Sequence, residues 1–198
     1  MYIHQIWIHD TIDDPPECYK KEWTQSFKDA HPNYIYKLWK REDIFTLIKE
    51  NEESFPGLYN IFVKVNTNII LADITKYVLM YIYGGIVADL DVKCLKSLHS
   101  FVDNGITYFN GSNQMIISSK DKILFKEFII KIIADISKYM NIQKIPVLKT
   151  VGPLALNFFI KDRDDWKLSE EMCAKNKKIV RKLNISSVFS IHIGQKFW

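Results

Sequence analysis

The chain has 198 residues, of which 47% are hydrophobic and 14% are aromatic, and its formal net charge is +4. This length and this supply of apolar side chains exclude a disordered chain and predict a single globular domain. Lysines are scattered along the sequence rather than clustered, so we expect no dedicated face for nucleic acid.

The cysteines and the apolar runs of the sequence indicate the cellular compartment. Cys18, Cys94 and Cys173 are odd in number and form no CxxC pair, which argues against a disulfide framework or a structural zinc site and favours a reducing compartment. No apolar run reaches the roughly 20 residues of a membrane span, and the first residues lack the features of a signal peptide. We therefore expect a protein in, or facing, the cytoplasm, without a transmembrane segment. The oligomeric state is left open.

The first half of the chain predicts alternating strands and helices. A buried strand is expected over residues 2–8, and a helix that begins at Asp13-Asp14-Pro15-Pro16 should run to Ala30. A strand over 34–39 and a short helix over 42–50 follow, while 54–66 fits neither pattern. The strongest helix covers 69–83, because caps precede it and Gly84-Gly85 ends it.

The second half continues the alternation. Strands are expected at 86–90, 107–109 and 115–118, a long amphipathic helix at 123–139, and a helix opened by Gly152-Pro153 that runs to about Lys161. A basic helix over 170–183 and a closing strand over 185–193 complete the pattern. Such alternation predicts an α/β fold with a mixed, mostly parallel sheet flanked by helices.

Asp89 and Asp91 directly follow a short apolar strand. Residues two apart in an extended chain face the same way, so the two carboxylates repel one another unless a cation lies between them. Their hard oxygen atoms suit Mn²⁺ or Mg²⁺, and ligands bind at strand ends in α/β sheets. The alternative is a solvated acidic turn, which is the commoner explanation of so short a motif.

The preceding helix favours the functional interpretation. Asp73, Lys76 and Tyr77 share one face at i, i+3 and i+4, and the rest of the helix is almost wholly apolar. Because a buried charge needs a partner, we expect these side chains to face a polar ligand or the acidic pair. A surface ion pair between Asp73 and Lys76 is the simpler alternative.

The segment 71–92, with Gly84-Gly85 and Asp89-x-Asp91 at its centre, resembles the DXD signature of glycosyltransferase family 32, which is distantly similar to the glucosylating domains of large clostridial toxins. Further matches follow in family order over nearly the whole chain: residues 3–7, Trp23, 32–39, 150–153, and Ile191-His192 with Trp198. The resemblance implies a single GT-A domain over 1–198, with a nucleotide-sugar half at about 1–95 and an acceptor-side half at about 96–198.

The resemblance also implies a role for each matching residue. Trp7, with Ile6, would hold the nucleotide base, and Trp198, with His192 near it, would close over the diphosphate. Asp73 and Tyr77 would contact the donor, and Lys76 stands where the family usually has arginine. Asp89 would bind donor hydroxyls and the water shell of the metal, and Asp91 would bind the metal directly. Asp73, Lys76, Asp89 and Asp91 are therefore the expected catalytic residues.

The implied activity is a metal-assisted transfer, with retention, of a hexose from a UDP- or GDP-sugar to a hydroxyl of a glycan or protein acceptor. Two rivals stay open. A module that binds a nucleotide sugar without transferring it would fit the change to Lys76 and Phe197 in place of the family's serine. A DxD phosphatase fits less well, because Lys93 stands where Thr or Val is expected.

Overall fold

The structure is a computed structural model that describes residues 1–17, 23–94, 96–102, 107–109, 113–139, 145–168 and 185–187. Its centre is a six-stranded sheet with the strand order β2-β1-β3-β6-β5-β7. The pairs β1–β2, β1–β3 and β5–β7 are parallel, whereas β3–β6 and β5–β6 are antiparallel. The predicted α/β fold with a mixed, mostly parallel sheet is therefore confirmed.

The strands lie close to their expected places. The six strands of the main sheet are β1 (Tyr2–Trp7), β2 (Ile35–Lys40), β3 (Gly85–Ala88), β5 (Thr107–Phe109), β6 (Met115–Ser118) and β7 (Trp166–Leu168). A second, two-stranded antiparallel sheet pairs β4 (Val92–Cys94) with β8 (Ile185–Ser187). No strand was expected at β4 or β7, because neither segment is an apolar run, and alternation over only three residues is too short to indicate a strand.

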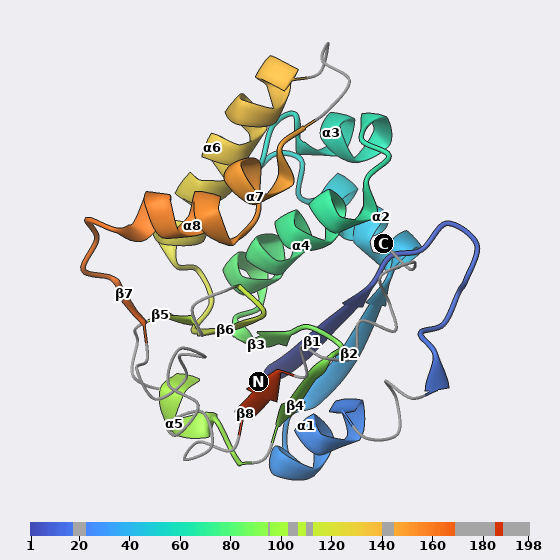
Figure 1. Cartoon of the computed structure of the whole chain (residues 1–198), viewed down its shortest axis with the longest axis vertical. Helices are drawn as coiled ribbons and strands as arrows, with labels where there is room; N and C mark the ends of the chain where they lie inside the picture. Colours follow the sequence, from blue (N-terminus) through green and yellow to red (C-terminus); the bar gives the residue numbers. More distant parts are fainter. Residues whose placement is uncertain are drawn as a thin grey trace.

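Helices cover both faces of the sheet. They are α1 (Gln25–Ala30), α2 (Arg41–Glu50), α3 (Leu58–Lys64), α4 (Asn68–Ile82), α5 (His99–Val102), α6 (Ile123–Tyr139), α7 (Val147–Thr150) and α8 (Pro153–Ile160). Figure 1 shows α2, α3, α4, α6, α7 and α8 on one side of the sheet, with α1, α5 and the β4–β8 pair on the other. Each side has its own apolar core; the larger lies around α4 and α6.

The first predicted helix is described at its two ends. Glu17 is helical, Trp23 and Thr24 form a π-helical turn that leads into α1 at Gln25, and residues 18–22 lie outside the described residues. Pro15 and Pro16 themselves are not helical. Asp14, which was expected at the helix start, instead forms an ion pair with Lys40 at 2.8 Å. A contact with β2 thus takes the carboxylate that local sequence reasoning assigned to a cap.

The helix α3 lies in the stretch that the sequence left ambiguous. It begins after Gly57, which adopts a left-handed conformation at φ 88° and has no side chain to act as a cap. The carboxylate of Glu52 supplies the cap instead, accepting hydrogen bonds from the N–H groups of Gly57 (2.8 Å) and Tyr59 (3.0 Å). This cap comes from outside the usual N-cap position, so the common sequence signals for a helix start are missing.

Two expected elements near the end of the chain reach residues that the structure does not describe. The basic helix over 170–183 lies outside the described residues altogether, and the closing strand over 185–193 is described only at Ile185–Ser187. None of the described helices is long and apolar enough to cross a bilayer. The expected cellular compartment stays a prediction.

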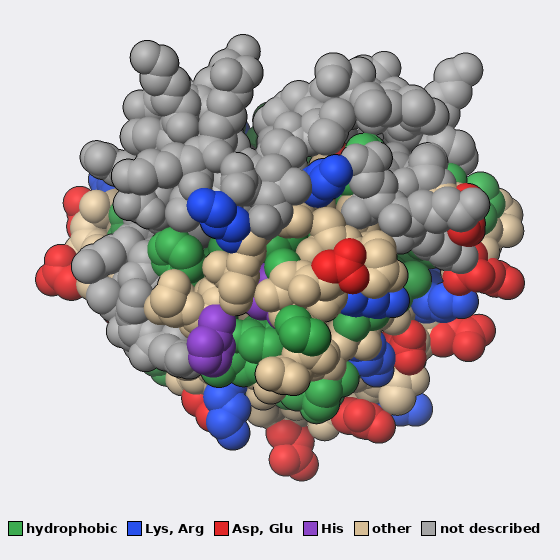
Figure 2. Space-filling view, turned by 90° about the horizontal axis from the view of Figure 1, so that it is seen from below, with side chains coloured by type: hydrophobic (Ala, Val, Ile, Leu, Met, Phe, Trp, Pro, Cys, Tyr) green, Lys and Arg blue, Asp and Glu red, His purple; other side chains and the backbone are tan. Residues whose placement is uncertain are grey.

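Figure 2 shows the molecule from below. On the part of this face that the structure describes, acidic and basic side chains are mixed with one another.

The turn from α4 into β3 depends on two glycines in left-handed backbone conformations. Gly84 has φ 62° and Gly85 has φ 93°. A Cβ atom on Gly84 would lie 2.3 Å from the backbone N of Lys120, and one on Gly85 would lie 2.2 Å from the carbonyl O of Tyr2. Only glycine fits both the backbone angles and the space, so the Gly84-Gly85 end predicted for this helix is confirmed.

The side chain of His4 connects the same turn to the strands β1 and β2 by hydrogen bonds. Its Nδ1 accepts a hydrogen bond from the indole N–H of Trp39 (3.0 Å), so the ring proton is on Nε2, which donates to the carbonyl of Gly84 (3.0 Å). Burial lowers the pKa of His4 from 6.5 to about 4, against the opposing effect of the bond to Gly84. The imidazole is therefore neutral at physiological pH and bridges β1, β2 and the glycine turn.

We expect Gly85→Ala to lower the free energy of unfolding by about 3 kcal/mol or more, because the methyl group would collide with the backbone of β1. Gly57→Ala is the matched control: its φ is also positive, but the added Cβ would meet only Ile133 Cγ2 at 3.7 Å, so a loss of about 1 kcal/mol is expected. Urea denaturation of both variants measures the difference. Equal losses would mean that the collision with Tyr2 is relieved at little cost.

Stability should also depend on pH through His4. The unfolded chain binds a proton on His4 near pH 6.5, and the folded chain only near pH 4. The contribution is therefore complete above pH 6.5 and declines by about 3 kcal/mol as the pH falls to 4. His4→Gln should unfold more easily at neutral pH but show a flatter decline over this range. Urea midpoints measured across the range would contradict the assignment if both proteins declined in parallel.

Candidate functional site

The acidic turn after β3 is held in place by its backbone. The N–H of Asp89 donates to the carbonyl of Gln114 (2.8 Å), and the N–H of Val92 donates to the carbonyl of Asp89 (3.1 Å). The side-chain amide of Gln5, from β1, donates to the same Asp89 carbonyl (3.2 Å). Because β1 and β3 are parallel, the turn lies at the carboxyl edge of the sheet, where α/β proteins bind ligands.

Lys76 joins two carboxylates that are sixteen positions apart in the sequence. Its Nζ lies 3.0 Å from Oδ1 of Asp73, one helical turn earlier, and 2.7 Å from Oδ1 of Asp89. The side chains of Lys76 and Asp73 are buried, whereas that of Asp89 keeps 30% of its surface exposed. The arrangement is thus a buried ion-pair network with one arm open to the surface, and not the surface pair that the sequence left as the alternative.

The electrostatics of the network favour bound positive charge. Burial acts to lower the pKa of Lys76, but the carboxylates of Asp89 and Asp73 outweigh it and hold the pKa above its ordinary value. Burial raises the pKa of Asp89, Lys76 lowers it, and the charges of Asp91 and Asp73 raise it further. Asp73 and Asp89 therefore share the ammonium group of Lys76, and the charge of Asp91 acts on Asp89 in addition.

Asn113 completes the network, although it was not among the site residues predicted from the sequence. Its side-chain amide donates to Oδ1 of Asp73 (3.0 Å) and to the hydroxyl of Tyr77 (3.0 Å), and that hydroxyl donates to the carbonyl of Val151 (2.8 Å). Asn113 has φ 48°, a conformation that asparagine tolerates better than most residues. A lone asparagine before a strand was the only local signal.

Gln114 leaves a polar atom unsatisfied beside the acidic turn. Its side-chain carbonyl oxygen is buried and has no hydrogen-bond partner, although its backbone binds Asp89. Buried polar atoms in proteins are almost always paired, so an unpaired acceptor requires an explanation. A ligand hydroxyl reaching this oxygen would provide the missing donor.

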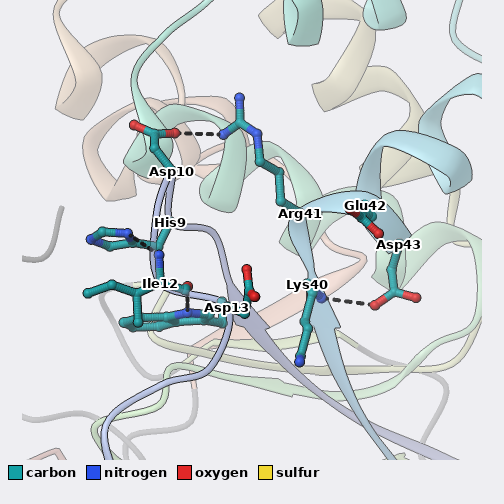
Figure 3. Close-up of a pocket in the computed structure, with 9 residues that line it drawn as sticks. His9, Asp10, Ile12, Asp13, Lys40, Arg41, Glu42 and Asp43 are labelled. Carbon is teal, nitrogen blue, oxygen red and sulfur yellow. Dashed lines mark hydrogen bonds and ion pairs between the residues drawn. The ribbon is translucent and has the colours of Figure 1, made fainter.

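Trp7 lies at the end of β1 beside a cavity of about 500 Å³. Figure 3 shows His9, Asp10, Ile12 and Asp13 along one wall, facing Lys40, Arg41, Glu42 and Asp43 where β2 passes into α2. Arg41 and Asp10 form an ion pair at 3.1 Å across the cavity. A volume of this size suits a small ligand, and the lining is strongly polar.

Trp7 itself is held firmly. Its indole N–H donates to the carbonyl of Ile12 (2.8 Å), its ring lies parallel to that of His9 at 5.8 Å, and only 3% of its surface is exposed. A ligand ring could therefore reach Trp7 only along its edge or after His9 moves. Gln5, which contacts the acidic turn, lies two residues earlier on the same strand, about 7 Å away.

The predicted site residues divide into three groups. The structure joins Asp73, Lys76, Tyr77 and Asp89 in one network, with Asp91 adjacent and Trp7 at the neighbouring cavity. The side chain of Ile6 packs into the core, so only its backbone is left to meet a ligand. His192 and Trp198 lie outside the described residues.

Comparison with known proteins places this geometry in a family context. Residues 17–120 match the family model described as the glycosyltransferase sugar-binding region containing a DXD motif. The chain is 27% identical to mannosyl phosphorylinositol ceramide synthase SUR1 of Saccharomyces cerevisiae, over 96% of this chain and 50% of that protein. It is 29% identical to inositol phosphoceramide mannosyltransferase 2 of Schizosaccharomyces pombe, over 79% of this chain and 44% of that protein. The chain thus spans about half the length of these relatives.

The fold also has a counterpart among solved structures. The PaToxG Glycosyltransferase superimposes with a TM-score of 0.56 at 15% identity, over 80% of this chain and 68% of that one. At this identity the likeness concerns the fold alone. It agrees with the GT-A type of single domain that the sequence resemblance implied.

Removing the ammonium group should leave two uncompensated carboxylates. We expect Lys76→Met to lower the free energy of unfolding by about 3–5 kcal/mol. Methionine keeps the aliphatic part of the side chain, but it leaves the buried carboxylate of Asp73 without its positively charged partner. Lys131→Met, which breaks a more exposed helical pair with Asp135, is the control, with an expected loss of about 0–1 kcal/mol. Adding Asp73→Asn to Lys76→Met should recover part of the loss in urea denaturation. No recovery would refute the electrostatic explanation.

Proposed function

Since the chain belongs to the family of glycosyltransferases whose sugar-binding region contains a DXD motif, we propose that it transfers a sugar from a nucleotide-diphosphate sugar to an acceptor hydroxyl. The observation that carries the proposal is the network of Asp73, Lys76 and Asp89 at the carboxyl edge of the sheet. A cavity of about 500 Å³ lies at the end of β1, which belongs to the same edge of the sheet; it is lined by other residues, among them Trp7. The donor would lie along this edge, with its base in the cavity beside Trp7.

We further propose that a divalent cation, Mn²⁺ or Mg²⁺, accompanies the donor. Among the described residues, no group of three His, Cys, Asp or Glu side chains could hold a metal by itself. Asp89 and Asp91 supply carboxylate oxygen, and Mg²⁺ is usually held by one or two carboxylates together with substrate phosphates. The pair therefore fits a cation that arrives with a diphosphate. Such a cation would neutralise the charge that develops on the leaving diphosphate.

Lys76 acts in this proposal as a positioning residue. Its ammonium is already engaged by Asp73 and Asp89, so it would fix the direction of both carboxylates and would not contact the donor itself. The arginine usual at this position would offer a planar fork with several donors, whereas lysine offers a single charge. Binding of the sugar would then fall to Asp73, Asp89 and the unpaired side-chain oxygen of Gln114.

Transfer with retention is proposed to proceed without a covalent sugar–enzyme intermediate. Asp73 is the carboxylate best placed as a nucleophile by sequence, but its Oδ1 accepts hydrogen bonds from both Lys76 and Asn113. Two such bonds stabilise the carboxylate and reduce its tendency to attack carbon. The acceptor hydroxyl would instead attack on the side from which the diphosphate leaves: its oxygen would bond to the sugar carbon as the bond to phosphate breaks, and its proton would pass to the departing phosphate oxygen.

The nature of the sugar and acceptor is inferred from the relatives. Several are named as mannosyltransferases acting on inositol phosphoceramide, which supports transfer of mannose or a related hexose to a hydroxyl of a lipid headgroup. A glycan or protein acceptor, expected from the sequence, is the alternative. The donor is a UDP- or GDP-sugar.

The proposal is tested by incubating the protein with UDP- and GDP-sugars and Mn²⁺ and following nucleotide release. We expect one donor to be hydrolysed slowly, with the rate reduced at least about hundredfold in Asp91→Asn and on removal of metal by EDTA. Asp162→Asn changes an exposed carboxylate after α8 and should leave the rate unchanged.

Two results would decide against transfer. Donor binding without turnover, even with inositol-containing lipids or glycans added, would favour the nucleotide-sugar-binding module. Hydrolysis of simple phosphoesters without any response to nucleotide sugars would favour a DxD phosphatase.

A further inference from the structure

The helices α7 and α8 carry large apolar side chains on their outer surface. Phe158 is 70% exposed, and Leu148 and Leu154 are each more than half exposed. Leu154 and Phe158 are four residues apart and therefore share one face of α8. The opposite face, with Ala155, Leu156 and Ile160, packs into the core. The helix α8 thus carries large apolar side chains on its outer face as well as its inner one, which is unusual for a helix that faces only water.

Within the segment that forms α7 and α8, the charged side chains have one sign. Residues 147–161 contain two basic residues, Lys149 and Lys161, and no carboxylate. The ammonium of Lys161 lies 4.7 Å from the centre of the Phe158 ring, and Asp162, at 3.6 Å, begins the acidic residues beyond α8. Apolar and aromatic side chains flanked by lysines form the pattern of a helix that lies at the interface of a lipid bilayer.

This surface adjoins the candidate site. Val151, between α7 and α8, is buried and its carbonyl accepts the hydrogen bond of Tyr77. Leu148 and Leu154 stand three positions before and after it, and both reach the surface. Figure 1 shows α7 and α8 as the outer layer over α4 and α6. One short connection therefore links the exposed apolar side chains to the Tyr77–Asn113–Asp73 chain of hydrogen bonds.

We propose that the α7–α8 surface, formed by Leu148, Lys149, Leu154, Phe158 and Lys161, docks on an anionic lipid bilayer. The three apolar side chains would enter the headgroup region, and the two lysines would meet lipid phosphates. Docking is independent of the proposed transfer chemistry. If that chemistry holds, docking brings the protein to a membrane that contains acceptor lipids.

The size of the patch argues for a bilayer over a second copy of the chain. Three side chains of this kind present on the order of 300 Å² of apolar surface, well below the ~800 Å² per partner of a stable protein interface. A lipid surface sets no such minimum, because a few inserted side chains and a few charges act together in reversible binding.

The test uses the 198-residue chain and vesicles of phosphatidylcholine and phosphatidylserine in equal parts. We expect the chain to float with these vesicles, and the double variant Leu154→Ser/Phe158→Ser to bind at least about tenfold more weakly. The matched control is Ile35→Ser/Val63→Ser, which removes two equally exposed apolar side chains on β2 and α3 and should bind like the unaltered protein.

A second pair of variants separates the electrostatic part. Lys149→Gln/Lys161→Gln should weaken binding to the anionic vesicles by about tenfold. It should change binding to vesicles of phosphatidylcholine alone far less. High salt should reproduce this effect in the unaltered protein, because screening acts on charge and not on apolar insertion.

Three outcomes would overturn the proposal: no binding of the unaltered chain, equal losses in the two apolar double variants, or a concentration-dependent dimer in sedimentation that Leu154→Ser/Phe158→Ser abolishes. Nucleotide release from a soluble donor should be the same in all these variants. Failure of vesicle binding with intact release therefore counts against docking alone, and loss of release in the unaltered chain counts against the proposed function alone.

Discussion

The ammonium of Lys76 holds together two parts of the chain that meet only in the folded protein. Asp73 lies one turn earlier on α4, and Asp89 follows β3 after the glycine turn. Without a cation between them, a buried carboxylate and a partly buried one would repel each other at short range. Helix, turn and strand end must therefore keep their relative positions for the network to exist, and the network in turn fixes the direction of the groups that face the candidate donor site.

The turn that leads into β3 is constrained as tightly as the charged network. Gly84 and Gly85 let the chain reverse with their Cα atoms against the backbone of Lys120 and Tyr2, and neutral His4 bonds the turn to β1 and Trp39. A small shift of this turn would carry Asp89 and Asp91 with it. Glycine sterics and one buried imidazole thus hold the start of β3, while hydrogen bonds to Gln5 and Gln114 hold the acidic turn at its end.

Most elements of the fold followed from local patterns, and the exceptions depend on contacts outside the element. Long apolar periodicity identified α4 and α6, an apolar run identified β1, and an aromatic-rich run identified β2. The stretch that holds α3 was left ambiguous because Glu52 caps this helix from outside the N-cap position. The strands β4 and β7 are not apolar runs, and alternation over three residues is too short to indicate a strand, so only their pairing partners identify them.

The sequence by itself determined the acidic pair, its helix face with Asp73, Lys76 and Tyr77, and the glycine turn between them, because spacing along one helix and one strand is a local property. Tertiary structure decided what those groups do to each other. It engaged Lys76 with two carboxylates, brought Asn113 to Asp73 and Tyr77, left the Gln114 oxygen unpaired, and turned Leu154 and Phe158 outward. Hydrogen bonds and burial between distant segments depend on the packing of the whole chain, which no local pattern records.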